Sequence, residues 1–223
     1  MSEKESVAKP SIPGMIWSPG EQFEKIRTNP KIWIPLIVLT VMSLLAGWLM
    51  TLSPGFEEQM TAGGGVNEED MSGFITFIKF TTVLSAGFGP AFGVLFSSFI
   101  YWLITKATSS EVTFKQLFSM STFITIIGAL GLILNGILLA IFGGSIETLY
   151  TSVGSLVDAE GGLGAFLNSI EIFGIWTTIL FAIGLHITAG WSKILAWTIS
   201  IVFFLIGIGF TTLSGALSSM TGM

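Results

Sequence analysis

Residues 89–122 read GPAFGVLFSSFIYWLITKATSSEVTFKQLFSMST, and this stretch decides the fold. It contains the end of one strongly apolar segment, a short charged connection with Lys106, Glu111 and Lys115, and the start of a second apolar segment. Two apolar helices joined by a short solvated turn form a membrane hairpin. Because short cytosolic loops are enriched in Lys and Arg, we expect this turn to lie on the cytosolic side.

The composition excludes a water-soluble protein. Hydrophobic residues make up 51% of the 223 residues, charged residues make up 10%, and the mean hydropathy is +0.82. One soluble core of this size could not bury so much apolar surface, so the class is a polytopic membrane protein. The chain has no cysteine, and its basic residues are too few and too scattered to bind nucleic acid.

Five apolar segments are each long enough to cross about 30 Å of hydrocarbon as a helix rising 1.5 Å per residue. We therefore predict an all-α bundle of five spans within residues 31–217. Lys79 precedes the second span and is expected to snorkel at the outer interface. The predicted spans are residues 31–52, 81–105, 118–143, 171–190 and 194–217.

The charged residues predict the orientation of these spans. In this topology eight of the nine Lys and Arg residues lie on one side, whereas loops 53–73 and 144–168 are acidic and rich in glycine. The positive-inside tendency places the N-terminus in the cytosol and the C-terminus outside. Residues 1–13 are expected to be a flexible cytosolic tail and residues 218–223 an outer tail, and no cleaved signal peptide is predicted.

Residues 14–30 are predicted to form an amphipathic helix before the first span. Ser18, Pro19 and Glu21 have the spacing of a capping box with proline at the first helical position. Trp17 and Phe23 are interspersed with Lys25, Arg27 and other charged residues, which is typical of a helix in the membrane interface. A soluble amphipathic turn leading into the first span is the alternative.

The second span contains Gly89, Pro90 and Gly93. Pro90 removes one helical hydrogen bond and is expected to kink the helix, either as a hinge or as a fixed, packed bend. The small-xxx-small spacing of Gly89 and Gly93 predicts close approach of a neighbouring helix.

Polar residues within the spans are few. Asn135 is expected to form an interhelical hydrogen bond, and His186 is expected to be a packing partner because a proton relay needs further ionisable groups. Glu171 is expected to cap the outer end of its helix in water or lipid headgroups. No catalytic, metal-binding or phosphate-binding motif is present, so we expect neither an enzyme nor a cofactor.

Several short motifs follow one another in a recognisable order along the chain. They are Trp17-Ser18-Pro19 with Glu21, Phe23, Ile26, Pro30 and Pro35, then Gly89-Pro90, the segment 113–119, Trp176, Gly184 and Ser192-Lys193. Their order resembles bacterial members of the Yip family, five-span proteins related to eukaryotic Ypt/Rab-interacting membrane proteins. The resemblance implies a multi-pass scaffold of the bacterial cytoplasmic membrane, without catalytic residues, that supports an ABC-type exporter of toxic peptides. The chain offers no recognisable site for a prenylated small GTPase.

Two functions follow as hypotheses: an accessory protein for other membrane proteins such as an ABC exporter, or a small transporter or channel that moves a solute itself. A homo-oligomer is a further arrangement that the sequence leaves open. The predicted partner surface is cytosolic and includes Trp17, Phe23, Lys25, Arg27 and Lys115. The same residue types would also suit anchoring in lipid headgroups.

Overall fold

The chain folds almost entirely into helices. The structure is a computed structural model, and it describes residues 9–61, 71–108, 110–144, 146, 149–157, 159 and 161–221. Within these residues the one β contact is an isolated bridge between Ser152 and Glu171. Five helices are long and apolar enough to cross a membrane, which confirms the predicted class: α3 (Trp33–Thr51), α5 (Met71–Ala107), α6 (Phe114–Phe142), α8 (Ile172–Ala189) and α9 (Lys193–Thr221).

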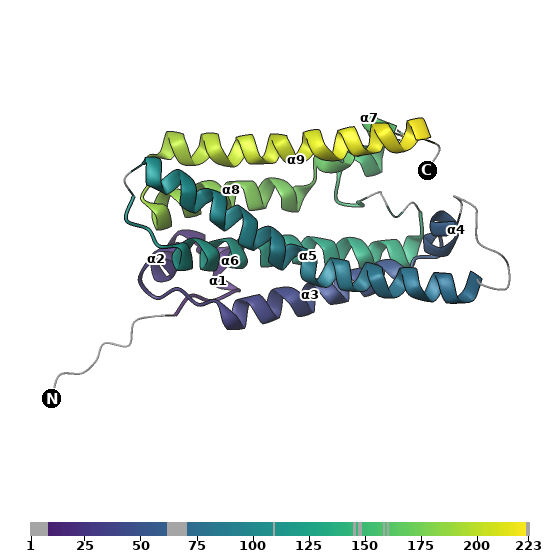
Figure 1. Cartoon of the computed structure of the whole chain (residues 1–223), viewed down its shortest axis with the longest axis horizontal. Coiled ribbons are helices and arrows are strands. Elements are labelled where there is room, and N and C mark those ends of the chain that lie inside the picture. The colour runs from purple at the N-terminus through teal and green to yellow at the C-terminus, as the bar shows by residue number, and fades with distance from the viewer. Residues whose placement is uncertain are drawn as a thin grey trace.

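The five long helices run side by side along the length of the molecule, with the two termini at opposite ends (Figure 1). One end carries α1 (Gly14–Trp17), α2 (Pro19–Thr28) and the α5–α6 and α8–α9 turns. We call it the basic end because Lys25, Arg27, Lys106, Lys115 and Lys193 lie there.

The opposite end, which we call the acidic end, carries Glu57, Glu58 and Glu171. Three short elements cover it: α4 (Phe56–Thr61), the 3₁₀ helix η1 (Val153–Leu156) and α7 (Gly161–Ser169). Which side of the membrane each end faces stays a prediction from the sequence.

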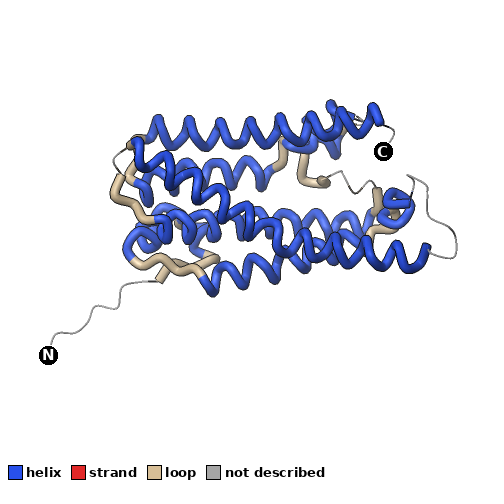
Figure 2. The backbone as a smooth tube through the Cα atoms, viewed as in Figure 1, coloured by secondary structure: helices blue, strands red, loops and turns tan. Residues whose placement is uncertain are grey.

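Helix α6 forms the centre of the bundle. It packs against α3, α5 and α8, and both of its faces bury side chains such as Phe123, Ile126 and Ile127. Helix α9 lies at the edge, where it contacts α8 and α7 and leaves Leu205 and Phe210 exposed. The tube view shows the described part of the chain as helices joined by loops, and no strand is drawn there (Figure 2). Exposed apolar side chains along α9 are those that lipid would cover.

Helix α5 is one continuous helix of 37 residues that passes through Pro90. At 1.5 Å per residue it is about 55 Å long, which exceeds the ~30 Å hydrocarbon layer and requires tilt or extension into the interface. Before Pro90 it packs against α3 at Gly87, and after Pro90 it still packs against α3, where Val94 lies in one cluster with Leu39. Tyr101, nearer the basic end, packs against Phe181 of α8 and Phe203 of α9. Nζ of Lys79 forms an ion pair with Oε1 of Glu57 of α4 at 2.5 Å, at the acidic end.

The terminal segments are more ordered than the sequence predicted. Residues 1–8 of the expected tail lie outside the described part, but Ile12 packs on the core and the amide of Ser11 donates to Oε1 of Gln22 at 2.9 Å. Helix α9 continues to Thr221, so the outer tail expected from residue 218 is helical over residues 218–221. Residues 222 and 223 lie outside the described part.

Candidate functional site

Three segments that are distant in the sequence form one surface at the basic end. Nε2 of Gln116 donates to the carbonyl of Arg27 at 2.5 Å, which joins the α5–α6 turn to α2. Oγ of Ser110 donates to the carbonyl of Ala189 at 2.5 Å, which joins the same turn to the end of α8. A cavity of about 430 Å³ lies between them. By the basic-end surface we mean the residues that line this cavity, among them Arg27, Glu111, Gln116 and Gly190, together with Trp17, Lys25 and Lys115 of the same end of the bundle.

Four of the five predicted partner residues lie on this surface. Trp17 is 82% exposed, Arg27 and Lys115 are exposed, and Lys25 forms an ion pair with Glu21 at 2.6 Å. The hydrogen bond from Lys25, together with its positive charge, lowers the pKa of Glu21 below its ordinary value. The expected exposure of Phe23 was wrong.

Phe23 is 0% exposed because α2 lies against the bundle. A Cβ atom at Gly184 of α8 would lie 3.0 Å from the Phe23 ring. The hydroxyl of Thr188, also in α8, donates to the Phe23 carbonyl at 3.4 Å. Met15 and Ile26 are also fully buried. The apolar face of α2 therefore holds the basic-end surface in place instead of forming part of it.

The predicted capping box at the start of α2 was wrong in its side-chain contacts. Ser18 is the N-cap and Pro19 is the first helical residue, but the Ser18 side chain makes no capping bond, and Glu21 turns to Lys25. A complete capping box lies instead at the start of α6, between Thr113 and Gln116. The Thr-x-x-Gln spacing before an apolar run could have predicted it.

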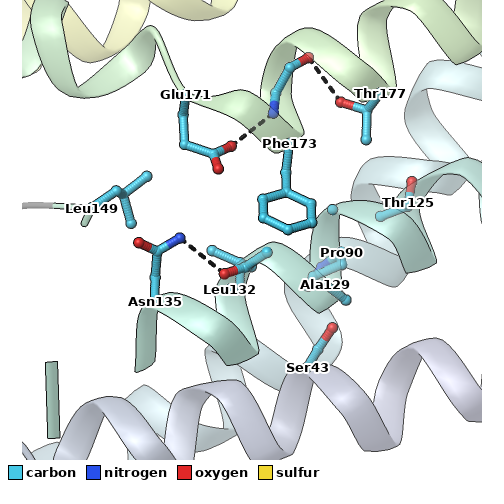
Figure 3. A pocket seen from close by; sticks show the side chains of 13 residues that line it. Ser43, Pro90, Thr125, Ala129, Leu132, Asn135, Leu149, Glu171, Phe173 and Thr177 are labelled. Carbon is cyan, nitrogen blue, oxygen red and sulfur yellow. Dashed lines mark hydrogen bonds between the residues drawn. The ribbon is translucent and has the colours of Figure 1, made fainter. Parts of the chain in front are cut away.

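A second polar cluster lies inside the bundle near the acidic end (Figure 3). Nδ2 of Asn135 donates to Oγ1 of Thr151 at 2.7 Å, and the Thr151 hydroxyl donates to Oε1 of Glu171 at 2.6 Å. The other carboxylate oxygen of Glu171 accepts the amide of Gly174 at 2.7 Å, so Glu171 caps α8. We call these three side chains the Asn135–Thr151–Glu171 cluster.

Three polar residues were predicted within or at the ends of the spans, and the surroundings of Asn135 and Glu171 differ from the prediction. Asn135 binds the loop before α7 and the carbonyl of Gly131 in its own helix, so the expected helix-to-helix bond was wrong. Glu171 caps its helix as predicted, but it is only 8% exposed because that loop covers it. His186 donates through Nδ1 to the carbonyl of Trp191 at 2.7 Å and closes the α8–α9 turn.

Asn135 and Glu171 of this cluster line a cavity of about 240 Å³ between the helices (Figure 3). Side chains from α3, α5, α6 and α8 meet there. Within the described residues no group of three or more His, Asp or Glu side chains could hold a metal ion. The arrangement can therefore bind through hydrogen bonds and one carboxylate. The cavity is lined by Ser43, Pro90, Thr125, Asn135, Glu171, Phe173 and Thr177, with neighbouring apolar residues.

The close helix contact predicted at Gly89 and Gly93 was wrong. A Cβ atom at either position would have no atom within 4 Å, and both residues are exposed. The tight approaches lie elsewhere: a Cβ at Gly47 would be 2.5 Å from the Cβ of Ala86, and one at Gly131 would be 2.5 Å from the ring of Phe173. Small residues therefore do mediate helix packing here, but at positions that the spacing did not indicate.

Comparison with known proteins places this helical arrangement in a family. Residues 14–214 match the Yip1 domain. The chain belongs to the Yip family. It is also 35% identical over 218 residues to Membrane protein YknW of Bacillus subtilis strain 168, a match that covers 96% of this chain and 94% of that relative. No solved structure matches.

The family assignment agrees with the resemblance seen in the motifs, and the protein is a multi-pass protein of the bacterial cytoplasmic membrane. The Yip1 match begins at the first residue of α1. The short helices of the basic end are therefore part of the Yip domain itself.

Proposed function

We propose that this Yip-family protein is a non-enzymatic scaffold that supports the assembly or activity of an ABC-type exporter for toxic peptides. The basic-end surface carries the proposal, because hydrogen bonds join three separate segments there and because Trp17, Arg27 and Lys115 are exposed at that end of the bundle. Trp and Arg are the residue types most enriched at interface hot spots. We infer that the partner is an exporter from the resemblance to bacterial Yip proteins.

The rigidity of this surface supports docking. Phe23 and Ile26 are fully buried under it, and Gln116 and Ser110 connect its segments through hydrogen bonds. A surface that is already ordered loses less conformational entropy when a partner binds. Anchoring in lipid headgroups would need only the exposed Trp17 and basic side chains, and no fixed geometry among the three segments.

Charge reversal separates these two uses. Arg27→Glu and Lys115→Glu should each lower co-purification of the exporter's ATPase and permease by about tenfold, because interfacial charge pairs are specific. Lys9→Glu is the matched control, since it makes the same charge change outside the surface. Undiminished recovery in both variants at unchanged membrane level would overturn docking at this surface. Equal losses in all three would indicate general attraction to anionic lipid.

A second function, a small transporter or channel, is favoured by the internal cavity. Ser43, Asn135 and Glu171 come from different helices and line the same space, and converging polar groups are typical of transport pathways. Proteoliposomes that contain only the purified protein provide the test, with Na⁺ flux and proton flux followed by fluorescent dyes. Flux above that of empty vesicles, abolished by Glu171→Gln, would favour this function over the scaffold.

A further inference from the structure

A groove opens on the side of the bundle between α5 and α9. The two helices meet near the basic end, where the rings of Tyr101 and Phe203 have centroids 5.2 Å apart, and they diverge toward the acidic end (Figure 1). The groove has a volume of about 530 Å³. Since α9 is an edge helix with exposed apolar side chains, the groove opens toward the lipid. It is lined mainly by apolar groups and hydroxyls, including Gly93, Ser97, Ser200, Phe204, Gly207 and Thr211.

The groove continues into the internal cavity of the Asn135–Thr151–Glu171 cluster. Pro90, Thr125, Gly174 and Thr177 line both spaces. The carboxylate of Glu171 points into the inner space beside the ring of Phe173 (Figure 3). A molecule that entered sideways from the membrane would therefore meet apolar walls first and an acidic group at the inner end.

Among the described residues the acidic group has no cationic neighbour. Its hydrogen-bond partners are neutral donors, the Thr151 hydroxyl and the Gly174 amide, and no Lys, Arg or His lines either space. A carboxylate can accept about four hydrogen bonds, so capacity remains for a ligand. Glu171 is only 8% exposed, and a positive charge close to such a buried carboxylate would stabilise it strongly.

Seven buried side-chain polar atoms of the described residues lack a hydrogen-bond partner, and two of them belong to residues that line these spaces. Ser43 lines the inner cavity and is 1% exposed, and Ser200 lines the groove and is 3% exposed. Buried polar groups are usually satisfied, so the Ser43 hydroxyl leaves capacity for a polar ligand atom in the inner cavity.

We propose that the groove and the inner cavity together bind a long-chain primary amine from the membrane. The apolar chain occupies the groove between α5 and α9, and the ammonium group binds the carboxylate of Glu171. An ammonium has three donors, and the Glu171 carboxylate keeps acceptor sites for them. The neighbouring ring of Phe173 also favours a cation over an anion or a neutral group. This binding is independent of the docking proposed for the basic end.

Dodecylamine is a suitable probe for the full-length protein in a non-ionic detergent at pH 7. We expect a saturable rise in melting temperature with dodecylamine and none with dodecanol or dodecanoate at equal concentration, because a ligand of the folded state stabilises it. Glu171→Gln should weaken the apparent affinity by about ten- to a hundredfold, as loss of a hydrogen-bonded charge does. Equal stabilisation by dodecanol would overturn the proposal.

Glycine variants test the groove without altering the acidic cluster. Gly93 and Gly207 line the groove, whereas Gly89 and Gly209 do not, and a Cβ at any of the four would have no atom within 4 Å. Gly93→Leu and Gly207→Leu should therefore fold and abolish the dodecylamine effect by filling the groove. Gly89→Leu and Gly209→Leu should keep it. An effect that persists in all four variants would show binding outside the groove and overturn the proposal.

Discussion

Gly47 and Gly93 lie in membrane helices but have different surroundings. A Cβ at Gly47 would clash with Ala86 and the backbone of Val83, whereas one at Gly93 would have no neighbour. Gly47→Ala should therefore lower the free energy of unfolding by about 1 to 3 kcal/mol through overpacking. Gly93→Ala should leave it unchanged or raise it by up to about 1 kcal/mol through helix propensity. Thermal unfolding in detergent measures both, and equal losses would contradict the packing at Gly47.

Thr151 connects the outer loop to the bundle through Asn135 and Glu171. Thr151→Val keeps the shape of the side chain but removes one hydrogen bond from each of two buried polar partners, so it should destabilise the protein by about 1 to 3 kcal/mol. Thr125→Val is the matched control, because the Thr125 hydroxyl bonds only to the carbonyl of Ser121 in its own helix. Comparable melting temperatures for the two variants would show that the cluster does not stabilise the loop.

These residues also show how far local sequence predicts environment. The position of Glu171 before an apolar run predicted its role as a helix cap, since capping depends on the next three residues. Its burial depends on the loop around Ser152, nineteen residues earlier, which folds over it. The spacing of Gly89 and Gly93 likewise could not show which helix, if any, lies beside them.

Helix α6 begins at a complete capping box. The Thr113 and Gln116 side chains each bond the other's backbone, and Gln116 also reaches the carbonyl of Arg27. Gln116→Ala should cost about 1 to 2 kcal/mol and loosen α2 from the α5–α6 turn, because both contacts are lost. Hydrogen exchange of the α2 amides should become faster. Lys115→Ala, an exposed neighbour, should leave the exchange unchanged, and equal exchange in both variants would contradict the connection.

Some helices can be predicted from their own sequence, and others cannot. The five long helices were predictable because each needs about twenty apolar residues, a pattern that survives any packing arrangement. Helix α7 was missed, because its sequence GGLGAFLNS is rich in glycine and reads as a loop. It forms against α9, where Gly215 allows Ala165 to approach closely. Tertiary packing therefore overrides a weak local propensity there.

At the scale of the whole molecule, hydropathy predicted how many helices cross the membrane but not how they pack. The central place of α6 and the edge position of α9 depend on side-chain fit between helices, which composition does not record. The same applies to the groove between α5 and α9. It exists because the two helices contact at Tyr101 and Phe203 and then separate. The sequence of either helix alone does not predict this separation.

The orientation of the bundle is the remaining whole-molecule prediction. The α5–α6 and α8–α9 turns share the basic end with α2, and α9 carries the chain to the opposite end (Figure 1). Alkaline-phosphatase fusions after Ser110 and Gly190 should therefore be inactive, and fusions after Gly65, Gly162 and Met223 should be active, because basic residues stay in the cytosol. Activity at Ser110 would reverse the orientation. An inactive but stably expressed fusion at Met223 would contradict a fifth crossing by α9, since only an odd number of crossings places the two termini on opposite sides.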